Sequence, residues 1–576
     1  MATSPDDLVA TSSAPGVPAP RPGSDAPELT SAARKRAMVV CVAAAFLTLL
    51  DVNIVTVALP SMEPALHMSS ADATWAIAGY TLAFGLTLIP AGRLADEIGR
   101  KKLFIWGMAL FALTGLLSGM ATNALWMDGT RLARGVAAGL VAPQVIGYIQ
   151  QMYPPIKRGR AFGYYGATVA LSTAIGPLLG GLILQAFGTG DGWRWIFYLF
   201  VPLDVAAFVF AIRALPEDRR TRQRRSLDLV GVLLLGLGVT GIMLPMIIGG
   251  STGPSPSARG TTGGTGGLPS GARPGGFPGA AGGQPPGGAG FGSGHFPTGA
   301  GGAGGTAGQA AAHVTAAASP GAGRPFWLLP IGIVLLVLFV LYERSLGRKQ
   351  RQPLLDLSLF RVRSYWVGTL VAAAFYGGFT GIFLVLSQYF QQGLHYTALH
   401  ASESIATFTI GSAVCGILGG RLVNRIGRSL VIYGSIATAV GLAATAVLVR
   451  TASPSDIGLV LALPLLVAGC GAGFVIAANQ TIALHRVPRR EGSTSAGVYQ
   501  TGMKLGVTLG TSIASGLYFA TLTSTHDDFA KAASAGLTGA AALAGAAFVV
   551  ALPGLTFRRR RNGEPIVAIG AVEPVS

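Results

Sequence analysis

Long apolar runs of similar length recur from one end of this sequence to the other. The segments 38–50, 232–246, 331–341 and 459–468 carry no charged residue. Each lies within an apolar stretch close to the roughly 20 residues that cross a bilayer. Because lipid offers backbone N–H and C=O groups no hydrogen bonds, such segments must be helical. With 51% hydrophobic and only 11% charged residues, the composition agrees, and the sequence predicts an all-α membrane protein.

Fourteen membrane-spanning helices are predicted from these runs. Their expected positions are 38–58, 74–92, 103–121, 125–149, 161–186, 195–212, 229–249, 326–343, 365–386, 403–420, 429–449, 457–481, 495–521 and 531–556.

The basic residues alternate between the loops that connect these spans. Of the 42 Lys and Arg residues, 33 fall in the tails and loops on one side and 6 on the other. The positive-inside rule then places both termini in the cytoplasm, which requires an even number of spans. We expect a multi-pass protein of the cell (inner) membrane, and topology accounts for the net charge of +18 without a nucleic-acid partner.

An internal repeat divides the chain into two related halves. The sequence GRLADEIGR at 92–100 recurs as GRLVNRIGR at 420–428, each directly after a predicted span. Related halves place a substrate site at their interface near mid-membrane. The predicted parts are a disordered cytoplasmic tail, an N-terminal six-helix bundle, a linker with two extra spans, a C-terminal six-helix bundle and a second cytoplasmic tail, at 1–37, 38–213, 214–363, 364–557 and 558–576.

The linker contains a segment that cannot build a core. Residues 251–325 are rich in Gly, Ala, Pro and Ser and have almost no large apolar side chains. We expect a disordered extracytoplasmic loop there, with a small soluble domain as the alternative.

The first copy of the repeat resembles the loop between the second and third spans of the major facilitator superfamily, and the chain resembles its fourteen-span drug:proton antiporter branch. The resemblance implies the major-facilitator fold, in which two extra transmembrane helices link two six-helix bundles. It also implies a latch that holds the cytoplasmic side closed in the outward-facing state, formed by Gly92, Asp96, Gly99, Arg100 and Lys101. A basic loop that only sets topology is the alternative. Asn424 replaces the acid in the second copy, which predicts a weaker latch there.

One acid lies inside the first span. Asp51, in LDVNIVTVALP at 50–60, resembles the first-span signature of this branch. A carboxyl group at that depth is costly and normally faces protein or a water-filled cavity, and desolvation favours its protonated form. Asp51 is therefore a candidate proton carrier, although a neutral acid that only packs is the alternative.

The fourth span carries two arginines. Arg131 matches the arginine of the Arg-x-x-Gln-Gly pattern that is associated with proton coupling in the family, and Arg134 replaces the usual Gln. Asp51 and Asp128 are the candidate partners of Arg131, and an arginine that snorkels to the interface is the alternative. Asp204 in the sixth span is a further proton-coupling candidate.

The fifth span resembles the motif regarded as characteristic of antiporters. The matching residues are Gly163, Gly176, Pro177, Gly180 and Gly181. Small residues allow close helix packing in any membrane bundle. With Gly176-Pro177 present, however, the resemblance implies export and not uptake.

Together these features predict a proton-coupled antiporter that exports small amphipathic or hydrophobic compounds, such as antibiotics, by alternating access. The expected partners are a small-molecule substrate, protons and membrane lipid, and the chain is expected to act as a monomer without a cofactor or metal. Two alternatives remain: a dedicated exporter of one metabolite, lipid or siderophore, and a non-transporting scaffold or sensor. No enzyme is predicted, because no nucleophile or metal-binding motif is present. Candidate residues of the substrate cavity are Trp75, Tyr80, Tyr389, Phe390 and Lys504.

Overall fold

The computed structural model describes residues 30–188, 190–217, 228–249, 327–348, 354–355, 357–453, 456–487, 492–526 and 528–552. These residues form helices joined by short turns, as predicted. The helices of the first part of the chain are α1 (Ser31–Ala65), α2 (Ser70–Ile98), α3 (Arg100–Gly119), α4 (Ala124–Met152), α5 (Pro155–Phe187), α6 (Trp193–Tyr198) and α7 (Val201–Ala214). The linker contributes α8 (Leu229–Gly249) and α10 (Leu328–Arg348), and the last part contributes α11 (Arg363–Gln388), α12 (Ala398–Ile426), α13 (Ser429–Thr451), α14 (Ile457–Ala483), α15 (Gly492–Ser524) and α16 (Phe529–Ala551).

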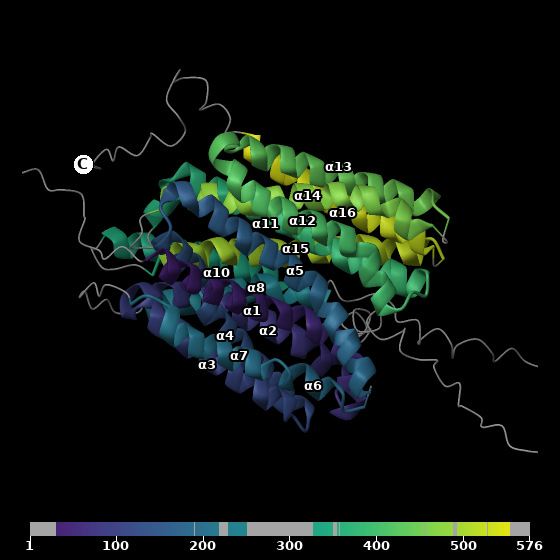
Figure 1. Ribbon diagram of the computed structural model, residues 1–576, viewed down its shortest axis with the longest axis horizontal. Helices are drawn as coiled ribbons and strands as arrows, with labels where there is room; N and C mark the ends of the chain where they lie inside the picture. Colours follow the sequence, from purple (N-terminus) through teal and green to yellow (C-terminus); the bar gives the residue numbers. More distant parts are fainter. Residues whose placement is uncertain are drawn as a thin grey trace, which may run out of the picture.

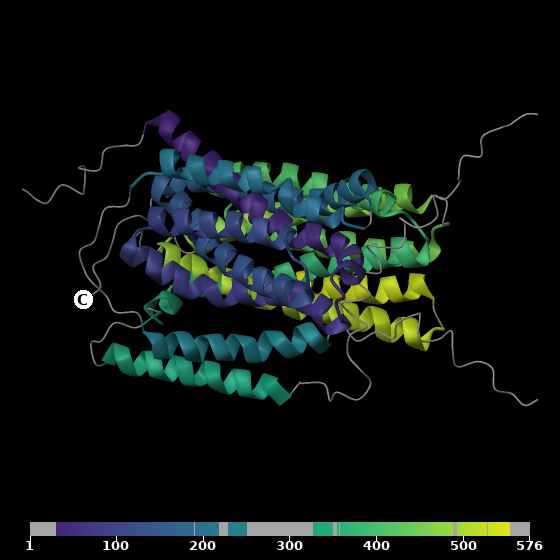
Figure 2. The ribbon, with the colours of Figure 1, turned by 90° about the horizontal axis from the view of Figure 1, so that it is seen from below.

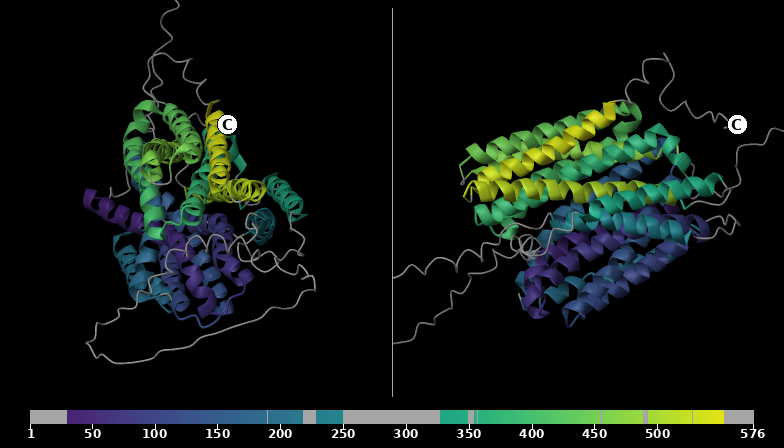
Figure 3. Two further views of the ribbon diagram at one scale, coloured as in Figure 1. Left: turned by 90° about the vertical axis from the view of Figure 1, so that its right-hand side faces the viewer. Right: turned by 180° about the vertical axis from the view of Figure 1, so that it is seen from behind.

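The helices assemble into two bundles that lie side by side. Helices α1–α7 form one bundle and α11–α16 form the other, as Figure 1 and the end view in Figure 3 show. The linker helices α8 and α10 run as a pair along one side of the molecule (Figure 2). They pack through Gly238, Gly241 and Gly332, where an added Cβ would come within 2.8 Å of the opposite helix.

Thirteen stretches of the described residues are long and apolar enough to cross a membrane. Helix α8 supplies a shorter apolar stretch, Val230–Pro245, beside α10. With the stretch from α8, these apolar stretches correspond one by one to the fourteen predicted spans. The predicted span 195–212 is divided into α6 and α7, because Pro202 at the start of α7 has no N–H to continue the helix.

The first helix begins earlier than the sequence predicted. Residues 31–37, assigned to a disordered tail, form the first two turns of α1. The side chain of Thr30 accepts a hydrogen bond from the N–H of Ala33 (3.2 Å), which caps the helix before the apolar stretch starts. The rest of the predicted tail 1–37, the loop 251–325 and the tail 558–576 lie outside the described residues.

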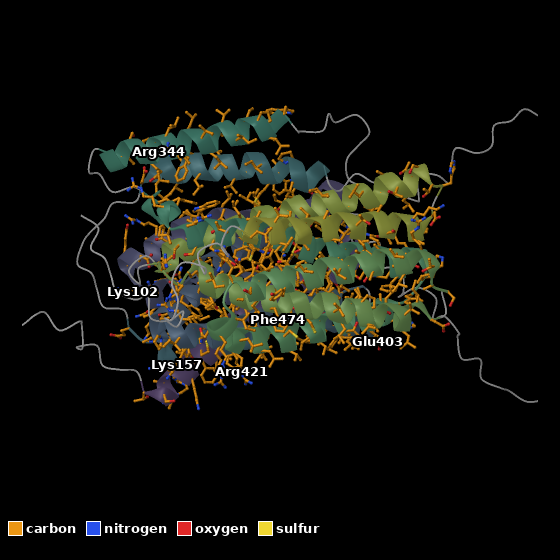
Figure 4. The ribbon with its side chains drawn as sticks, turned by 90° about the horizontal axis from the view of Figure 1, so that it is seen from above. Lys102, Lys157, Arg344, Glu403, Arg421 and Phe474 are labelled. Atoms are coloured by element: carbon orange, nitrogen blue, oxygen red, sulfur yellow. The ribbon has the colours of Figure 1, made fainter. Side chains whose placement is uncertain are left out.

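Basic side chains mark one end of the molecule, which we call the basic end. Lys102, Lys157, Arg344 and Arg421 lie there, and Glu403 lies at the opposite end (Figure 4). The two copies of the repeat turn the chain at this end. Gly99 (φ 103°) and Gly427 (φ 64°) occupy the left-handed region, which favours glycine, so both repeats use their glycine for the same purpose.

Glycines let α15 lie directly against α11. A Cβ on Gly506 would collide with the carbonyl oxygen of Ala373, and one on Gly510 would collide with the backbone of Gly377. Small residues are the usual means of close helix packing in lipid, where the hydrophobic effect does not drive helices together.

We therefore expect Gly506→Ala to separate α15 from α11 and lower the thermal stability of the purified protein. Overpacking of this kind costs about 1–3 kcal/mol of the free energy of unfolding. Gly516→Ala is the matched control, because Gly516 lies on the same helix with nothing within 4 Å of an added Cβ. Melting temperatures measured in detergent should fall for the first variant and not for the second, and equal values would contradict the packing argument.

Candidate functional site

Two arginines of α4 hold one aspartate of α1 in the interior of the N-terminal bundle. Arg131 Nη1 donates to Asp51 Oδ2 at 2.6 Å, and Arg134 Nε donates to Asp51 Oδ1 at 2.7 Å. The side chains of Asp51, Arg131 and Arg134 are 5%, 1% and 2% exposed. Both carboxylate oxygens are therefore bound by guanidinium groups, an arrangement that strongly favours the ionised form of Asp51 in this conformation.

The second arginine also reaches a second acid. Arg134 Nη2 donates to Asp204 Oδ2 of α7 at 3.3 Å, and Asp204 is fully buried. Within the described part of the chain, the other oxygen, Oδ1, has no hydrogen-bond partner. Asp51, Arg131, Arg134 and Asp204 thus form a buried quartet of two acids and two bases.

Backbone carbonyls and aromatic rings complete the coordination of the arginines. Arg131 Nε donates to the carbonyl of Ala76 (2.8 Å), and Arg134 Nη1 donates to that of Phe111 (2.6 Å). Arg131 lies 4.4 Å from the ring centroid of Tyr80, and Arg134 lies 3.8 Å from that of Phe111. Such contacts offset part of the cost of burying a cation.

Two glycines provide the space that this arrangement needs. A Cβ on Gly115 of α3 would collide with Arg134 Nη1, and one on Gly135 of α4 would collide with the carbonyl oxygen of Tyr80. The guanidinium of Arg134 consequently lies against bare backbone of α3. Gly135 matches the glycine of the family's Arg-x-x-Gln-Gly pattern.

The structure brings together three predicted residues, Asp51, Arg131 and Asp204. Asp51 is the partner of Arg131, whereas no ion pair joins Asp128 to Arg131 among the described residues. Sequence reasoning missed the bridging position of Arg134, which it noted only as an unusual second cation. The spacing contained the signal, because residues three apart on a helix project from the same face.

A second polar site lies at the basic end, between the two bundles. Asp96 of α2 accepts hydrogen bonds from the N–H groups of Ser493 (3.3 Å) and Thr494 (2.9 Å) and from the Thr494 hydroxyl (2.8 Å). It also pairs with Arg100 at 3.1 Å. Ser493 and Thr494 begin α15, so a carboxylate of one bundle caps a helix of the other, where the helix dipole favours negative charge.

The other predicted latch residues lie around Asp96. Gly92 touches the backbone of Ser493 so closely that a Cβ would collide with its carbonyl oxygen. Arg100 also donates to the carbonyl of Gly147 (3.3 Å) and to Gln151 (3.2 Å), and thereby joins α3 to α4. Gly99 forms the turn, and Lys101 follows in the first turn of α3.

The second copy of the repeat makes an equivalent contact by a different group. The amide of Asn424, at the position equivalent to Asp96, donates to the carbonyl of Ile156 at the start of α5. Gly420 lies against the backbone of Gly159 and Gly163. At this position the α5–α12 contact uses a neutral amide, whereas the α2–α15 contact uses a carboxylate.

The residues of the predicted antiporter motif divide between two neighbours of α5. Gly176 and Gly180 approach Asn53 and Ile54 of α1, next to Asp51, and Gly163 approaches Gly416 of α12. Pro177 lies inside α5, and an added Cβ on Gly181 would meet nothing within 4 Å. The motif therefore sets the distance between α5 and the helix that carries Asp51.

Four of the five predicted cavity residues are aromatic, and three of those are buried. Tyr80 is fully buried beneath Arg131 and donates to the carbonyl of Thr48 (3.0 Å), so it supports the quartet instead of lining an accessible cavity. Tyr389 and Phe390 are buried in a π-helical turn at the end of α11. Trp75 is 39% exposed near the start of α2. Lys504 keeps part of its surface accessible midway along α15, and its ammonium lies 4.5 Å from the ring centroid of Phe84.

The site consists of two acids and two bases inside the N-terminal bundle. Over the residues that the structure describes, no cluster of His, Cys, Asp and Glu has the arrangement of a metal site. Buried acids paired with movable bases, at membrane depth and next to an interface between two bundles, are typical of transporters.

Comparisons of sequence place the chain among known transporters. The family model of the Major Facilitator Superfamily matches residues 41–511. The chain is 28% identical to a probable actinorhodin transporter of Streptomyces coelicolor, over 89% of this chain and 78% of that protein. It is 29% identical to a puromycin resistance protein of Streptomyces alboniger, over 83% and 80% of the two chains. It is 27% identical to a multidrug resistance protein B homolog of Mycobacterium tuberculosis, over 87% and 80%.

Comparisons of structure support the same fold. The proton:xylose symporter XylE superposes with a TM-score of 0.57 at 13% identity, covering 92% of this chain and 96% of that chain. The human organic anion transporter MFSD10 gives a TM-score of 0.55 at 14% identity, covering 90% and 99%. The family model matches most of the chain, and the structure has the paired helix bundles of the fold. The chain therefore belongs to the Major Facilitator Superfamily and is a multi-pass membrane transporter, not an enzyme.

Proposed function

We propose that this chain exports small amphipathic compounds from a bacterial cytoplasm across the inner membrane in exchange for protons. The buried quartet of Asp51, Arg131, Arg134 and Asp204 is the observation that carries the proposal. Relatives named for puromycin and multidrug resistance support export. The cluster of Lys and Arg at the basic end supports a cytoplasmic location for that end.

The two acids of the quartet are held to different extents. A proton on Asp51 would disrupt two short ion pairs, at 2.6 and 2.7 Å. A proton on Asp204 would disrupt one contact of 3.3 Å, and the second oxygen of Asp204 is already without a partner among the described residues. In this conformation Asp204 therefore binds a proton at lower cost, and Asp51 stays ionised between the arginines.

Proton binding at Asp204 changes what Arg134 holds together. Arg134 connects α4 to α1 through Asp51 and to α7 through Asp204. Neutralising Asp204 removes the charge that draws α7 toward α4 and leaves Arg134 with Asp51 alone. The proton thereby alters helix packing inside one bundle, which is the kind of two-state change that can bias alternating access.

The conformation of the structure fits the step of the transport cycle at which protons bind from outside. The bundles are joined at the basic end by Asp96 with Ser493 and Thr494, by Asn424 with Ile156, and by Gln500, which donates to the carbonyl of Ala142 (3.1 Å). With the basic end in the cytoplasm, the cytoplasmic side is closed. Substrate then leaves to the outside, and protons enter from there, before the bundles rock about the central interface.

The direction of proton movement tests the exchange. Puromycin, chosen because a relative is named for resistance to it, is added outside right-side-out membrane vesicles that contain the protein. If the vesicles exchange it for protons, its entry drives protons outward and the weakly buffered medium acidifies. A substrate panel extends the assay to other amphipathic compounds. Alkalinisation of the medium on substrate entry would instead identify a symporter.

We expect Asp204→Asn and Asp51→Asn to fail in different ways. Asp204→Asn leaves the Asp51 ion pairs in place but removes the proton site, so substrate exchange without a gradient should persist while gradient-driven export is lost. Asp51→Asn removes the shared partner of two buried arginines, and breaking such pairs costs about 3–5 kcal/mol. It should lower both substrate exchange and gradient-driven export by about tenfold or more. Exchange is measured as counterflow, and export as gradient-driven transport, in proteoliposomes.

Asp528→Asn is the control for these variants, because Asp528 is partly exposed at the start of α16 and pairs with Lys531 (3.0 Å). It should transport like the native protein. Gradient-driven export by Asp204→Asn at the native rate would assign the proton to another residue.

We further expect Asp96→Asn to weaken the closure of the basic end. The variant loses the charge that caps α15 and pairs with Arg100. Spin labels at Lys102→Cys and Arg421→Cys, in a background with Cys41, Cys415 and Cys470 replaced by Ser, report the distance between the bundles. Populations with longer distances should increase. Asp72→Asn, which removes a capping acid near the other end of α2, should leave the distribution unchanged. The same distribution in both variants would argue that Asp96 is not a latch.

A further inference from the structure

One cation of the membrane interior has no carboxylate within ion-pair distance in the part of the chain that the structure describes. The charges of the quartet cancel, because two arginines face two aspartates. Lys504 of α15 is different. Among the residues described, no carboxylate lies within ion-pair distance of its ammonium group, which contacts the ring of Phe84 at 4.5 Å. A cation–π contact offsets only part of the cost of removing an ammonium from water.

The location of Lys504 is that of a substrate site. It lies twelve residues into α15 (Gly492–Ser524), about 18 Å from the start of that helix by its rise per residue. Its neighbour Phe84 belongs to α2 of the other bundle, so the pair lies at the interface between the two bundles. Transporters with related halves place their substrates at this interface near mid-membrane.

Lys504 also lies just beyond the closure of the basic end. Gly497, two turns earlier on α15, touches the backbone of Leu88 on α2 so closely that a Cβ would collide with the carbonyl oxygen of Leu88. Gly502, Gly506 and Gly510, spaced four apart on another face of α15, lie against α11 of its own bundle. Lys504 thus lies two turns along α15 from a close backbone contact with α2, and its ammonium still contacts α2 at Phe84.

Lys504 differs from the two arginines in the burial of the residue as a whole. Arg131 and Arg134 are almost completely buried, with every charged contact made inside the protein. Lys504 keeps part of its surface accessible, and the neighbouring Gly502, Met503 and Leu505 do too. A flexible ammonium next to an aromatic ring and apolar side chains suits an organic anion with an apolar body.

We propose that Lys504 is the anion-binding residue of the substrate site, and that the transporter accepts amphipathic organic anions such as aromatic carboxylates. The carboxylate pairs with the ammonium, and the apolar body of the ligand lies against Phe84 and the surrounding apolar side chains. The assignment deepens the proposed export function and names a substrate class for it.

The test measures equilibrium binding, so its outcome does not depend on proton coupling or on the direction of transport. Full-length protein in lipid nanodiscs is titrated with 2-naphthoate, with its neutral methyl ester and with the cationic 2-naphthylmethylamine. The native protein should bind the carboxylate more tightly than the ester. Lys504→Gln should weaken carboxylate binding by about tenfold, equivalent to about 1.4 kcal/mol, leave the ester unchanged and improve binding of the amine. Lys504→Arg, which keeps the charge, should retain most of the preference for the carboxylate.

Lys531→Gln is the matched control, because it removes the same charge from a half-exposed site at the start of α16. Its affinities should equal those of the native protein. Equal affinity of the native protein for carboxylate and ester would overturn the proposal. Parallel loss of both ligands in Lys504→Gln would also overturn it, since that result indicates a structural role. Transport assays on the native protein then report separately on the proposed export.

Discussion

The pairing of Asp51 with two arginines is the interaction on which the N-terminal bundle depends. A guanidinium group cannot be left unpaired at membrane depth, and here two of them share one carboxylate. Satisfying the remaining donors then fixes the neighbouring helices, because α2 and α3 must present the carbonyls of Ala76 and Phe111 to the arginines. The glycines at 115 and 135 follow from the same requirement, since any side chain there would occupy the space of the guanidinium or of the α2 backbone.

The closure of the basic end shows how a near-symmetric fold becomes functionally asymmetric. Both repeats place a turn glycine at the same point and both contact the opposite bundle. Only the first uses a carboxylate, which makes three hydrogen bonds to the start of α15 and an ion pair with Arg100. Charge-assisted hydrogen bonds are about twice as strong as neutral ones. At the equivalent position the α5–α12 contact uses the neutral amide of Asn424, next to close glycine packing.

The fold could be predicted from the sequence because lipid leaves few choices. The length of the apolar runs predicts the membrane-spanning helices, and the alternation of basic loops predicts their orientation. The internal repeat predicts the two halves. The site was predictable only in part. Asp51, Arg131 and Asp204 stand out as charges among apolar residues, but their pairing through Arg134 depends on how α1, α4 and α7 pack, which periodicity does not specify. Tyr80 shows the same limit. An aromatic residue in a span suggests a cavity wall, yet burial under Arg131 is decided by tertiary contacts.

The two charged regions of the membrane interior are physically connected. Lys504 lies over Phe84, Phe84 meets Tyr80 edge-on with ring centroids 6.1 Å apart, and Tyr80 lies under Arg131. Phe84 and Tyr80 are one turn apart on α2, the same helix that carries Asp96 at the basic end. A shift of α2 relative to α4 and α15 consequently changes the environment of the unpaired lysine, the support of the buried arginine and the closure of the basic end together. Coupling between distant sites requires a contiguous element with two arrangements, and α2 is the helix that touches all three.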